Sequence, residues 1–201
     1  GNIRLKKIEK ETEIIIRNQR GSPYKFISAV SGGHYSLYLL LGENGENNQL
    51  AYVYKKENKG VPLFLNLNNH NPKYLFGGCD VSVAVCSDGS MFVITKSVFK
   101  SPNDEMESFY LPNDEKPISI AVCIDCFVAV GSKGGVYESP LNRESICRLI
   151  LLPIKELEGK SIINVSGYYK HVFAVSQDGK VFGRGNNSYN RLGFGKLYDN
   201  Y

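Results

Sequence analysis

The residues of this chain whose types and spacing could perform chemistry lie in two stretches. Cys123 and Cys126 have the Cys-x-x-Cys spacing of a redox pair or of half a zinc site. The segment 171–195, HVFAVSQDGKVFGRGNNSYNRLGFG, combines His171 and Arg184 with several glycines, as a phosphate-binding loop or a catalytic site could. Whether either stretch is a site depends on the elements that position it.

The composition favours an all-β protein. The chain has 201 residues, of which 42% are hydrophobic, and this is enough for a substantial core. It contains 20 glycines, 8 prolines, 13 tyrosines and 10 phenylalanines, together with many valines and isoleucines. Such residues are typical of short strands joined by tight turns.

The charge pattern gives no indication of nucleic acid binding. The net charge of +4 comes from 24 basic and 20 acidic residues that are mixed along the chain. The most basic segment, residues 3–20, also carries glutamates, so we interpret it as a solvated face rather than a phosphate-binding patch. We therefore expect nucleic acid or chromatin contacts to be absent or weak.

The chain has no membrane-span pattern and no signal-peptide pattern. Its five cysteines are an odd number without the regular framework of a small secreted scaffold, which favours reduced thiols. These features predict a cytoplasmic or nuclear protein.

A repeat of 45 residues organises the whole chain. Gly32, Gly77, Val122 and Gly167 are spaced by 45 and anchor segments that align without gaps. A first strand ends two residues before each anchor, at Val30, Leu75, Ile120 or Val165, and a second short apolar strand follows each anchor by six to eight residues. These second strands are Tyr38–Leu40, Val83–Val85, Val128–Val130 and Phe173–Val175.

Each unit continues with a turn and a third strand. The turn dipeptides are Glu43-Asn44, Asp88-Gly89, Lys133-Gly134 and Asp178-Gly179. We expect them to supply the positive φ angles of two-residue hairpins. The strand after the turn carries Phe92, Tyr137 or Phe182 at one offset in the last three units.

Four short strands in about 45 residues are typical of a propeller blade. A sandwich or a solenoid is the alternative, but glycines and prolines interrupt the long amphipathic runs that helical repeats need. The sequence thus predicts one domain over residues 1–201, built as a β-propeller of about four blades and incomplete as a ring.

The last unit carries the most specific motifs. Residues 152–195 contain Leu-x-Gly-Lys, Ala-Val-Ser-x-Asp-Gly, Gly-x-Asn and Leu-Gly-x-Gly. This segment resembles one repeat of the regulator of chromosome condensation family. The other units share only the strand core and the turn. The resemblance implies a β-propeller in which the late glycines connect blades and Asn186 satisfies backbone groups.

The elements argue against both chemical interpretations. Phosphate binding needs a helix N-terminus, and no amphipathic helix follows Gly183, Gly185, Gly193 or Gly195. Cys123 and Cys126 fall in the register of a strand, where residues three apart point to opposite faces. They could neither pair nor share an ion unless the corner at Val122 bends sharply, so we predict packed free thiols.

The remaining candidates give no catalytic constellation. The family resemblance implies a buried, hydrogen-bonding structural role for His171. Ser31, Ser166 and Ser176 lie outside any nucleophile elbow. The carboxylate pairs Asp104-Glu105 and Asp114-Glu115 are interpreted as solubilising turn residues. We assign no catalytic, metal-binding or cofactor-binding residue and expect no cofactor.

Two functions remain. The first is a protein–protein interaction scaffold, in which variable loops on a repetitive frame contact a protein partner. The alternative, implied by the resemblance, is nucleotide exchange on a Ran-type small GTPase with chromatin association. We expect the open ends of the array to expose EIIIRN, residues 13–18, and HVFAV, residues 171–175, and therefore expect self-association.

Overall fold

The structure is a computed structural model that describes residues 3–8, 11–16, 22–31, 35–42, 47–54, 62–78, 81–95, 106–141 and 150–193. Almost all of its regular elements are strands, and the short helices are of the 3-10 type. The N-terminal strands are β1 (Ile3–Ile8) and β2 (Glu11–Ile16). The next are β3 (Phe26–Ser31), β4 (Tyr35–Leu40), β5 (Gln49–Tyr54) and β6 (Leu63–Leu65). They are followed by β7 (Pro72–Gly77), β8 (Val81–Cys86), β9 (Met91–Thr95) and β10 (Ser108–Phe109).

The second half repeats this pattern. It contains η2 (Pro112–Asp114), β11 (Pro117–Val122), β12 (Cys126–Gly131), β13 (Val136–Pro140) and β14 (Leu152–Pro153). It ends with η3 (Lys155–Leu157), β15 (Ile162–Tyr168), β16 (His171–Ser176), β17 (Val181–Gly185) and η4 (Ser188–Asn190).

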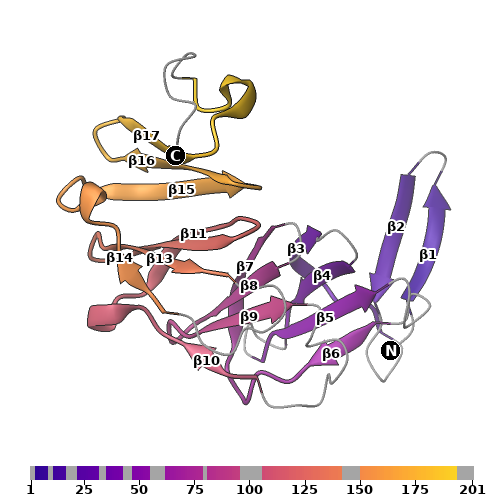
Figure 1. The fold of residues 1–201 in the computed structure, drawn as a ribbon. Coiled ribbons are helices and arrows are strands. Elements are labelled where there is room, and N and C mark those ends of the chain that lie inside the picture. The colour runs from indigo at the N-terminus through magenta and orange to yellow at the C-terminus, as the bar shows by residue number, and fades with distance from the viewer. Residues whose placement is uncertain are drawn as a thin grey trace.

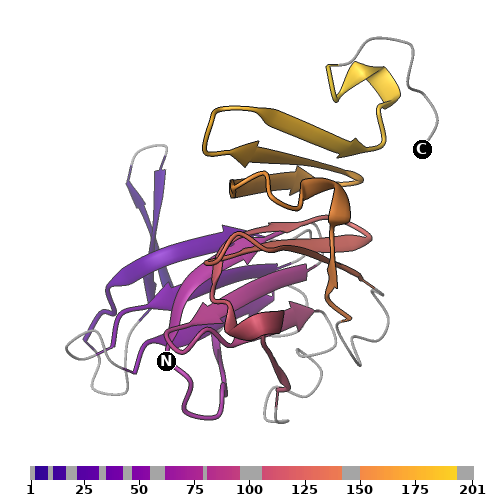
Figure 2. The ribbon, with the colours of Figure 1, turned by 90° about the vertical axis from the view of Figure 1, so that its left-hand side faces the viewer.

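Among the described residues, strands β3 to β17 form four antiparallel sheets in chain order, which we call blades 1 to 4. Their strand orders are β3-β4-β5-β6, β7-β8-β9-β10, β11-β12-β13-β14 and β15-β16-β17. The sheets follow one another as stacked layers, with β15 to β17 at the top of both ribbon views (Figures 1 and 2). The first strands of successive blades contact each other, from β3 through β7 and β11 to β15. The predicted all-β propeller of about four blades is confirmed.

The 45-residue period appears directly in the first strands of the blades. Strands β7, β11 and β15 begin at residues 72, 117 and 162, and the anchors Gly77 and Val122 end the first two of these strands. The anchor glycines provide space: a Cβ on Gly77 would lie 2.8 Å from the Cβ of Val30 in the preceding blade. First strands lie closest together, so a side chain at this position would hold the blades apart.

The turns after the second strands are longer than predicted. Gly89 donates a backbone hydrogen bond of 3.0 Å to the carbonyl of Cys86, and Cys86 donates one of 2.9 Å to Ser90. Only the glycine has a positive φ, which is 92° at both Gly89 and Gly134. This is a type I turn followed by a glycine bulge. The prediction of a two-residue hairpin with positive φ at both turn residues was therefore wrong. The Glu43-Asn44 turn of the first unit lies outside the described residues.

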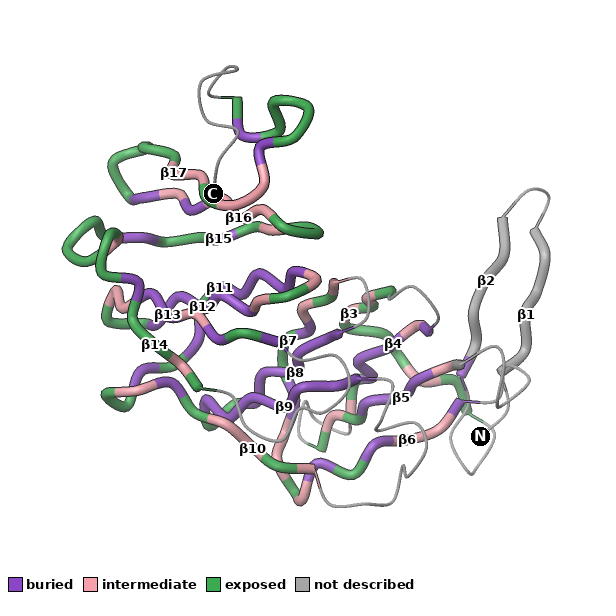
Figure 3. The backbone as a smooth tube through the Cα atoms, viewed as in Figure 1, coloured by how far each residue is buried: buried purple, intermediate pink, exposed green. Residues whose placement is uncertain are grey.

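The core lies between the blades rather than inside any one of them. In blade 2, Val83 and Val85 pack with Phe127 of blade 3, whereas Ala84 packs with Leu39 of blade 1. Because successive side chains of a strand point to opposite faces, a second strand with a blade on both sides is buried on both faces, as all six residues of β8 are, Ser82 included. Buried residues concentrate in β4, β8, β9, β11 and β12, while blade 4 is mostly exposed or half-buried (Figure 3).

A bulge recurs at one position in every first strand. The pairing with the second strand skips one residue in each blade, and these unpaired residues are Ile27, Lys73, Ile118 and Ile163. All four side chains are exposed. We call these four residues the inner wall, because they belong to the strands that meet along one side of the array. A bulge re-aims a side chain and leaves its residue out of the ladder.

The N-terminal residues form an element that the period did not predict. Strands β1 and β2 pair as an antiparallel hairpin. At its end Ile16 is fully buried and packs with Tyr38, Leu40 and Ala51 of blade 1. The expectation that this end of the array exposes an apolar strand was therefore wrong at Ile16. Among the described residues, no helix is long and apolar enough to cross a membrane.

Candidate functional site

In blades 2, 3 and 4, the residue two positions before the first strand contacts the aromatic residue of the third strand in the same blade. His70 packs edge-on against Phe92 at 5.2 Å between ring centroids. Glu115 accepts a hydrogen bond from Tyr137, and the ammonium of Lys160 lies 5.3 Å from the ring centre of Phe182. Residues 70, 115 and 160 are spaced by the repeat, as are their partners. Equivalent places in three blades thus hold an imidazole, a carboxylate and an ammonium.

The carboxylate of Glu115 closes the turn of blade 3. It accepts hydrogen bonds of 2.6 Å from the Tyr137 hydroxyl, 2.8 Å from the Lys133 amide and 3.2 Å from the Gly135 amide. Burial opposes ionisation of Glu115, but these hydrogen bonds and the nearby charge of Lys133 outweigh it and lower its pKa. Glu115 is buried, so its interpretation as a solubilising residue was wrong. The pair Asp104-Glu105 lies outside the described residues.

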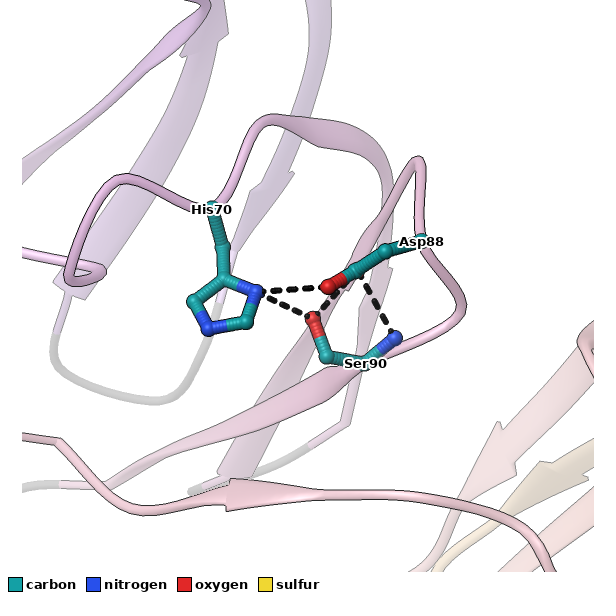
Figure 4. A network of polar contacts seen from close by, with 3 residues as sticks. All are labelled: His70, Asp88 and Ser90. Carbon is teal, nitrogen blue, oxygen red and sulfur yellow. Dashed lines mark hydrogen bonds and ion pairs between the residues drawn. The ribbon is translucent and has the colours of Figure 1, made fainter.

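His70, Asp88 and Ser90 form the polar network of blade 2 (Figure 4). The Nδ1 atom of His70 lies 2.8 Å from an Asp88 carboxylate oxygen and 3.0 Å from the Ser90 hydroxyl. That hydroxyl donates a hydrogen bond of 2.7 Å to the other oxygen of Asp88, and the Ser90 amide donates one of 3.0 Å to the same oxygen. Burial opposes ionisation of Asp88, but these hydrogen bonds and the interaction with His70 lower its pKa.

The network has the residue types of a hydrolytic triad without its geometry. In a triad the histidine contacts the carboxylate through one nitrogen and the nucleophile through the other. Here both partners face Nδ1, and the serine hydroxyl already donates to the carboxylate. His70 therefore cannot be oriented by Asp88 at one nitrogen while accepting the Ser90 proton at the other. The arrangement closes a turn, as Glu115 does in the next blade. The sequence analysis predicted neither the His70–Asp88–Ser90 network nor the contact of Glu115 with the turn.

The glycine-rich stretch 171–195 is structural over its described part. After β17 the chain enters a 3-10 turn of three residues, which is no phosphate-binding helix. The Asn186 side chain accepts a hydrogen bond of 2.7 Å from the Ser188 amide, as the family resemblance implied. Asn187, the asparagine of the Gly-x-Asn motif, is buried and accepts one of 2.9 Å from the Leu192 amide. Gly185 has a φ of 109° and lies so close to Lys170 that a Cβ would overlap its carbonyl.

His171 does not play the expected hydrogen-bonding role through Nδ1. This atom is buried and has no hydrogen-bond partner among the described residues. The ring instead packs edge-on against Phe173, with ring centroids 6.1 Å apart. Ser176 is also structural: its hydroxyl donates to Asp178 within the turn of blade 4.

Cys123 and Cys126 do not lie on one strand. Strand β11 ends at Val122 and β12 begins at Cys126, so the two cysteines flank the turn between them. The Cys123 amide donates a hydrogen bond of 2.8 Å to the carbonyl of Cys126. The argument that opposite faces separate the two thiols was wrong, because the chain bends just after Val122. Neither cysteine is in a disulfide bond, and Cys123 is buried while Cys126 is half-buried.

Within the part of the chain that the structure describes, no cluster of three or more histidine, cysteine or acidic side chains is arranged to hold a metal ion. The feature that could recognise a partner is the inner wall. Ile27, Ile118 and Ile163 are 44%, 51% and 49% exposed at equivalent places in three blades. Aliphatic side chains exposed at regular intervals on a rigid frame provide an interaction surface.

Comparisons with known proteins agree with the blade geometry. Residues 162–191, which include all of blade 4, match the model of the regulator of chromosome condensation (RCC1) repeat. No curated protein matches the chain by sequence. Human WBSCR16 is similar in structure, with a TM-score of 0.68 and 15% identity over 98% of this chain. Prp20p from Saccharomyces cerevisiae has a TM-score of 0.68 and 17% identity over 96% of this chain.

The chain is shorter than these proteins. It covers 57% of the human structure and 52% of the yeast structure. A second yeast structure, RCC1 (Prp20) bound to Kap60, has a TM-score of 0.66, 16% identity, and coverage of 96% of this chain and 50% of that one. The chain thus spans about half the length of the solved structures it resembles. At these identities the likeness shows the fold.

Proposed function

Because residues 162–191 form a repeat of the regulator of chromosome condensation family within a propeller array, we propose that this chain is a protein–protein interaction scaffold. The observation that carries the proposal is the inner wall, where one recurring bulge places Ile27, Ile118 and Ile163 in solvent. Covering exposed aliphatic side chains with a partner removes apolar surface from water, which makes binding more favourable. The second strands of blades 1, 2 and 3 are almost entirely buried, and β15, which carries Ile163, packs against β11, so the frame holds these side chains at fixed places.

The similar yeast proteins support a protein partner. One is described bound to Kap60, and the other is described by its binding to Gsp1p and histones. For this chain, a protein partner is proposed and a small GTPase is the alternative partner. We propose a non-enzymatic role, since the histidine, serine and carboxylate groups described above serve in turns rather than in a catalytic constellation.

We also propose that residues 1–201 are one repeat domain and that its ring is completed by further blades. Four blades match about half the length of the solved propellers. Blade 4 has a half-buried strand β16 and an exposed Val181 on β17. A further blade, or a second copy of the chain, would cover this face.

The inner wall is tested by replacing its isoleucines with aspartate. The variant Ile27→Asp/Ile118→Asp/Ile163→Asp is compared with wild type and with Ile150→Asp/Leu152→Asp, which changes somewhat more exposed residues outside the wall. Immobilised proteins are compared by quantitative affinity capture after melting curves show that all three fold. We expect wild type and the Ile150→Asp/Leu152→Asp control to capture specific proteins that the wall variant does not capture. Identical capture by all three proteins contradicts the proposal.

Nucleotide exchange is tested separately. A Ran-type GTPase loaded with fluorescent GDP is mixed with substoichiometric amounts of the chain, and nucleotide release is followed by fluorescence. We expect no acceleration over spontaneous release. Catalytic acceleration of nucleotide release would contradict the scaffold proposal and support the exchange function. Binding of the GTPase without acceleration would instead identify it as a partner of the scaffold.

A further inference from the structure

The turn between β11 and β12 brings two thiols together. Cys123 and Cys126 are joined by a backbone hydrogen bond of 2.8 Å across the turn. Residues opposed in this way have Cα atoms about 5.5 Å apart. This separation lies within the range of roughly 4.4 to 6.8 Å that disulfide bonds span. The backbone thus places the pair at bonding distance without a rearrangement of either strand.

The two thiols differ in the way that a redox pair requires. Cys126 is half-buried and accessible, whereas Cys123 is 2% exposed. The neighbouring Cys123 thiol lowers the pKa of Cys126; burial and the charges of Asp125 and Glu138 oppose this, while Arg184 assists it. An accessible thiol with a lowered pKa beside a second thiol is the arrangement found in redox-sensing cysteines.

We propose that Cys123 and Cys126 form a reversible dithiol–disulfide pair whose oxidant is a hydroperoxide. With hydrogen peroxide, the Cys126 thiolate attacks one peroxide oxygen. A sulfur–oxygen bond forms, the oxygen–oxygen bond breaks, and the leaving hydroxide takes up the proton that Cys126 had released, giving water. Cys126 is now a sulfenic acid.

The second step consumes the buried thiol. The Cys123 sulfur attacks the sulfur of Cys126, forming the disulfide and breaking the sulfur–oxygen bond. The departing hydroxide takes the Cys123 proton and leaves as a second water. Two thiols and one hydrogen peroxide thus yield one disulfide and two waters, with two electrons passing from sulfur to oxygen. A dithiol reductant reverses the process by thiol–disulfide exchange.

The pair lies at the junction between blades 3 and 4. The Cys123 thiol donates a hydrogen bond of 3.5 Å to the carbonyl of His171 in β16. Between the cysteines, the Ile124 amide donates one of 2.7 Å to the Tyr169 carbonyl, and Asp125 lies 3.9 Å from Lys170. Oxidation removes the thiol proton that contacts blade 4, so it changes the surface that blade 3 presents to its neighbour.

The experiment oxidises the intact protein and maps its thiols. Protein treated with hydrogen peroxide is quenched, alkylated with N-ethylmaleimide and digested with trypsin, which cleaves after Lys100 and Lys133 but not between Lys116 and Pro117. The peptide 101–133 contains Cys123 and Cys126 and no other cysteine. We expect this peptide to lose two hydrogen atoms and to take up no maleimide. Dithiothreitol before alkylation should restore two maleimide additions.

Cys86 is the matched control within the same chain. It is buried, and desolvation raises its pKa to about 11, so we expect it to stay reduced while the pair oxidises. Fragment spectra separate it from Cys79 in the same peptide. In Cys123→Ser, Cys126 should stop at the sulfenic acid, which dimedone traps. In Cys126→Ser, the buried Cys123 should resist peroxide. The wild-type peptide map decides the question if either variant fails to fold.

Three results overturn the proposal. One is a peptide 101–133 that stays fully alkylated after Cys86 has been oxidised. Another is oxidation of Cys126 to sulfinic acid while Cys123 still takes up maleimide. The third is stoichiometric zinc in the purified protein that is released when the pair is alkylated, because the cysteines would then be metal ligands.

Discussion

The Tyr137 hydroxyl donates a hydrogen bond of 2.6 Å to the carboxylate of Glu115, 22 residues earlier in the chain. This bond joins the segment that enters blade 3 to the third strand of the same blade. The same carboxylate accepts two backbone amides of the intervening turn. One side chain thus fixes a loop, a turn and a strand relative to each other. His70 and Lys160 occupy the equivalent places in the neighbouring blades, where they contact the rings of Phe92 and Phe182.

We expect Glu115→Gln to lower the free energy of unfolding at neutral pH by about 1 to 3 kcal/mol, because hydrogen bonds to a charged acceptor are lost. The pKa of Glu115 is lowered in the folded protein from its ordinary 4.5, so folding favours the carboxylate. Its contribution is present above pH 4.5 and disappears as the pH falls through the folded-state pKa.

Urea titrations of wild type and Glu115→Gln across this pH range measure the difference between their free energies of unfolding. This difference should become smaller as the pH falls through and below 4.5. Tyr137→Phe removes one of the three hydrogen bonds and serves as a graded control, expected to cost about 1 kcal/mol. Equal stability of wild type and Glu115→Gln at neutral pH would show that the carboxylate does not hold the turn.

We expect Ser90 to be unreactive toward a fluorophosphonate probe. Its hydroxyl donates to Asp88, and His70 offers both partners the same nitrogen, so no base is placed to activate the serine. Ser90→Ala should instead reduce stability by about 1 kcal/mol through loss of hydrogen bonds in the turn. Intact mass spectrometry after probe treatment measures how much of the protein carries the covalent label. Stoichiometric labelling that His70→Ala abolishes would identify a catalytic site.

We expect Gly167→Ala to destabilise the junction of blades 3 and 4 by roughly 1 to 3 kcal/mol, as overpacking does. The added Cβ would lie 2.7 Å from the buried Cys123 sulfur and 3.1 Å from the His171 carbonyl. Cys123→Ala removes the first of these contacts, so the double variant should cost less than the sum of the single variants. Thermal unfolding of the four proteins completes the cycle. Strict additivity would mean that the sulfur does not limit the approach of the blades.

We expect the open face of blade 4 to limit the stability of the isolated chain. Val181 is 60% exposed, and β16 is half-buried over most of its length. In repeat arrays each added neighbour contributes an interface, so appending a further blade should raise the melting temperature. Light scattering should show self-association of the chain alone, which Val181→Lys should reduce. A monodisperse monomer with a high, cooperative melting transition would contradict this expectation.

The sequence by itself determined the features that repeat. Strand starts at residues 72, 117 and 162 and positive φ at Gly89, Gly134 and Gly179 follow from patterns within one 45-residue unit. Such features depend on local preferences: alternation of apolar side chains, the conformational freedom of glycine, and the length of a blade. The last unit also resembles the regulator of chromosome condensation repeat most strongly, and residues 162–191 within it match the model of that repeat.

Only the tertiary structure decided which side chains meet. Cys123 and Cys126 face each other because the strand ends one residue before Cys123, a boundary that the register of an apolar run does not define. Glu115 is buried because the path of its loop crosses the turn of blade 3, and Ile16 because the N-terminal hairpin packs on blade 1. Each contact depends on how loops and neighbouring elements are placed, and residue spacing alone does not fix that placement.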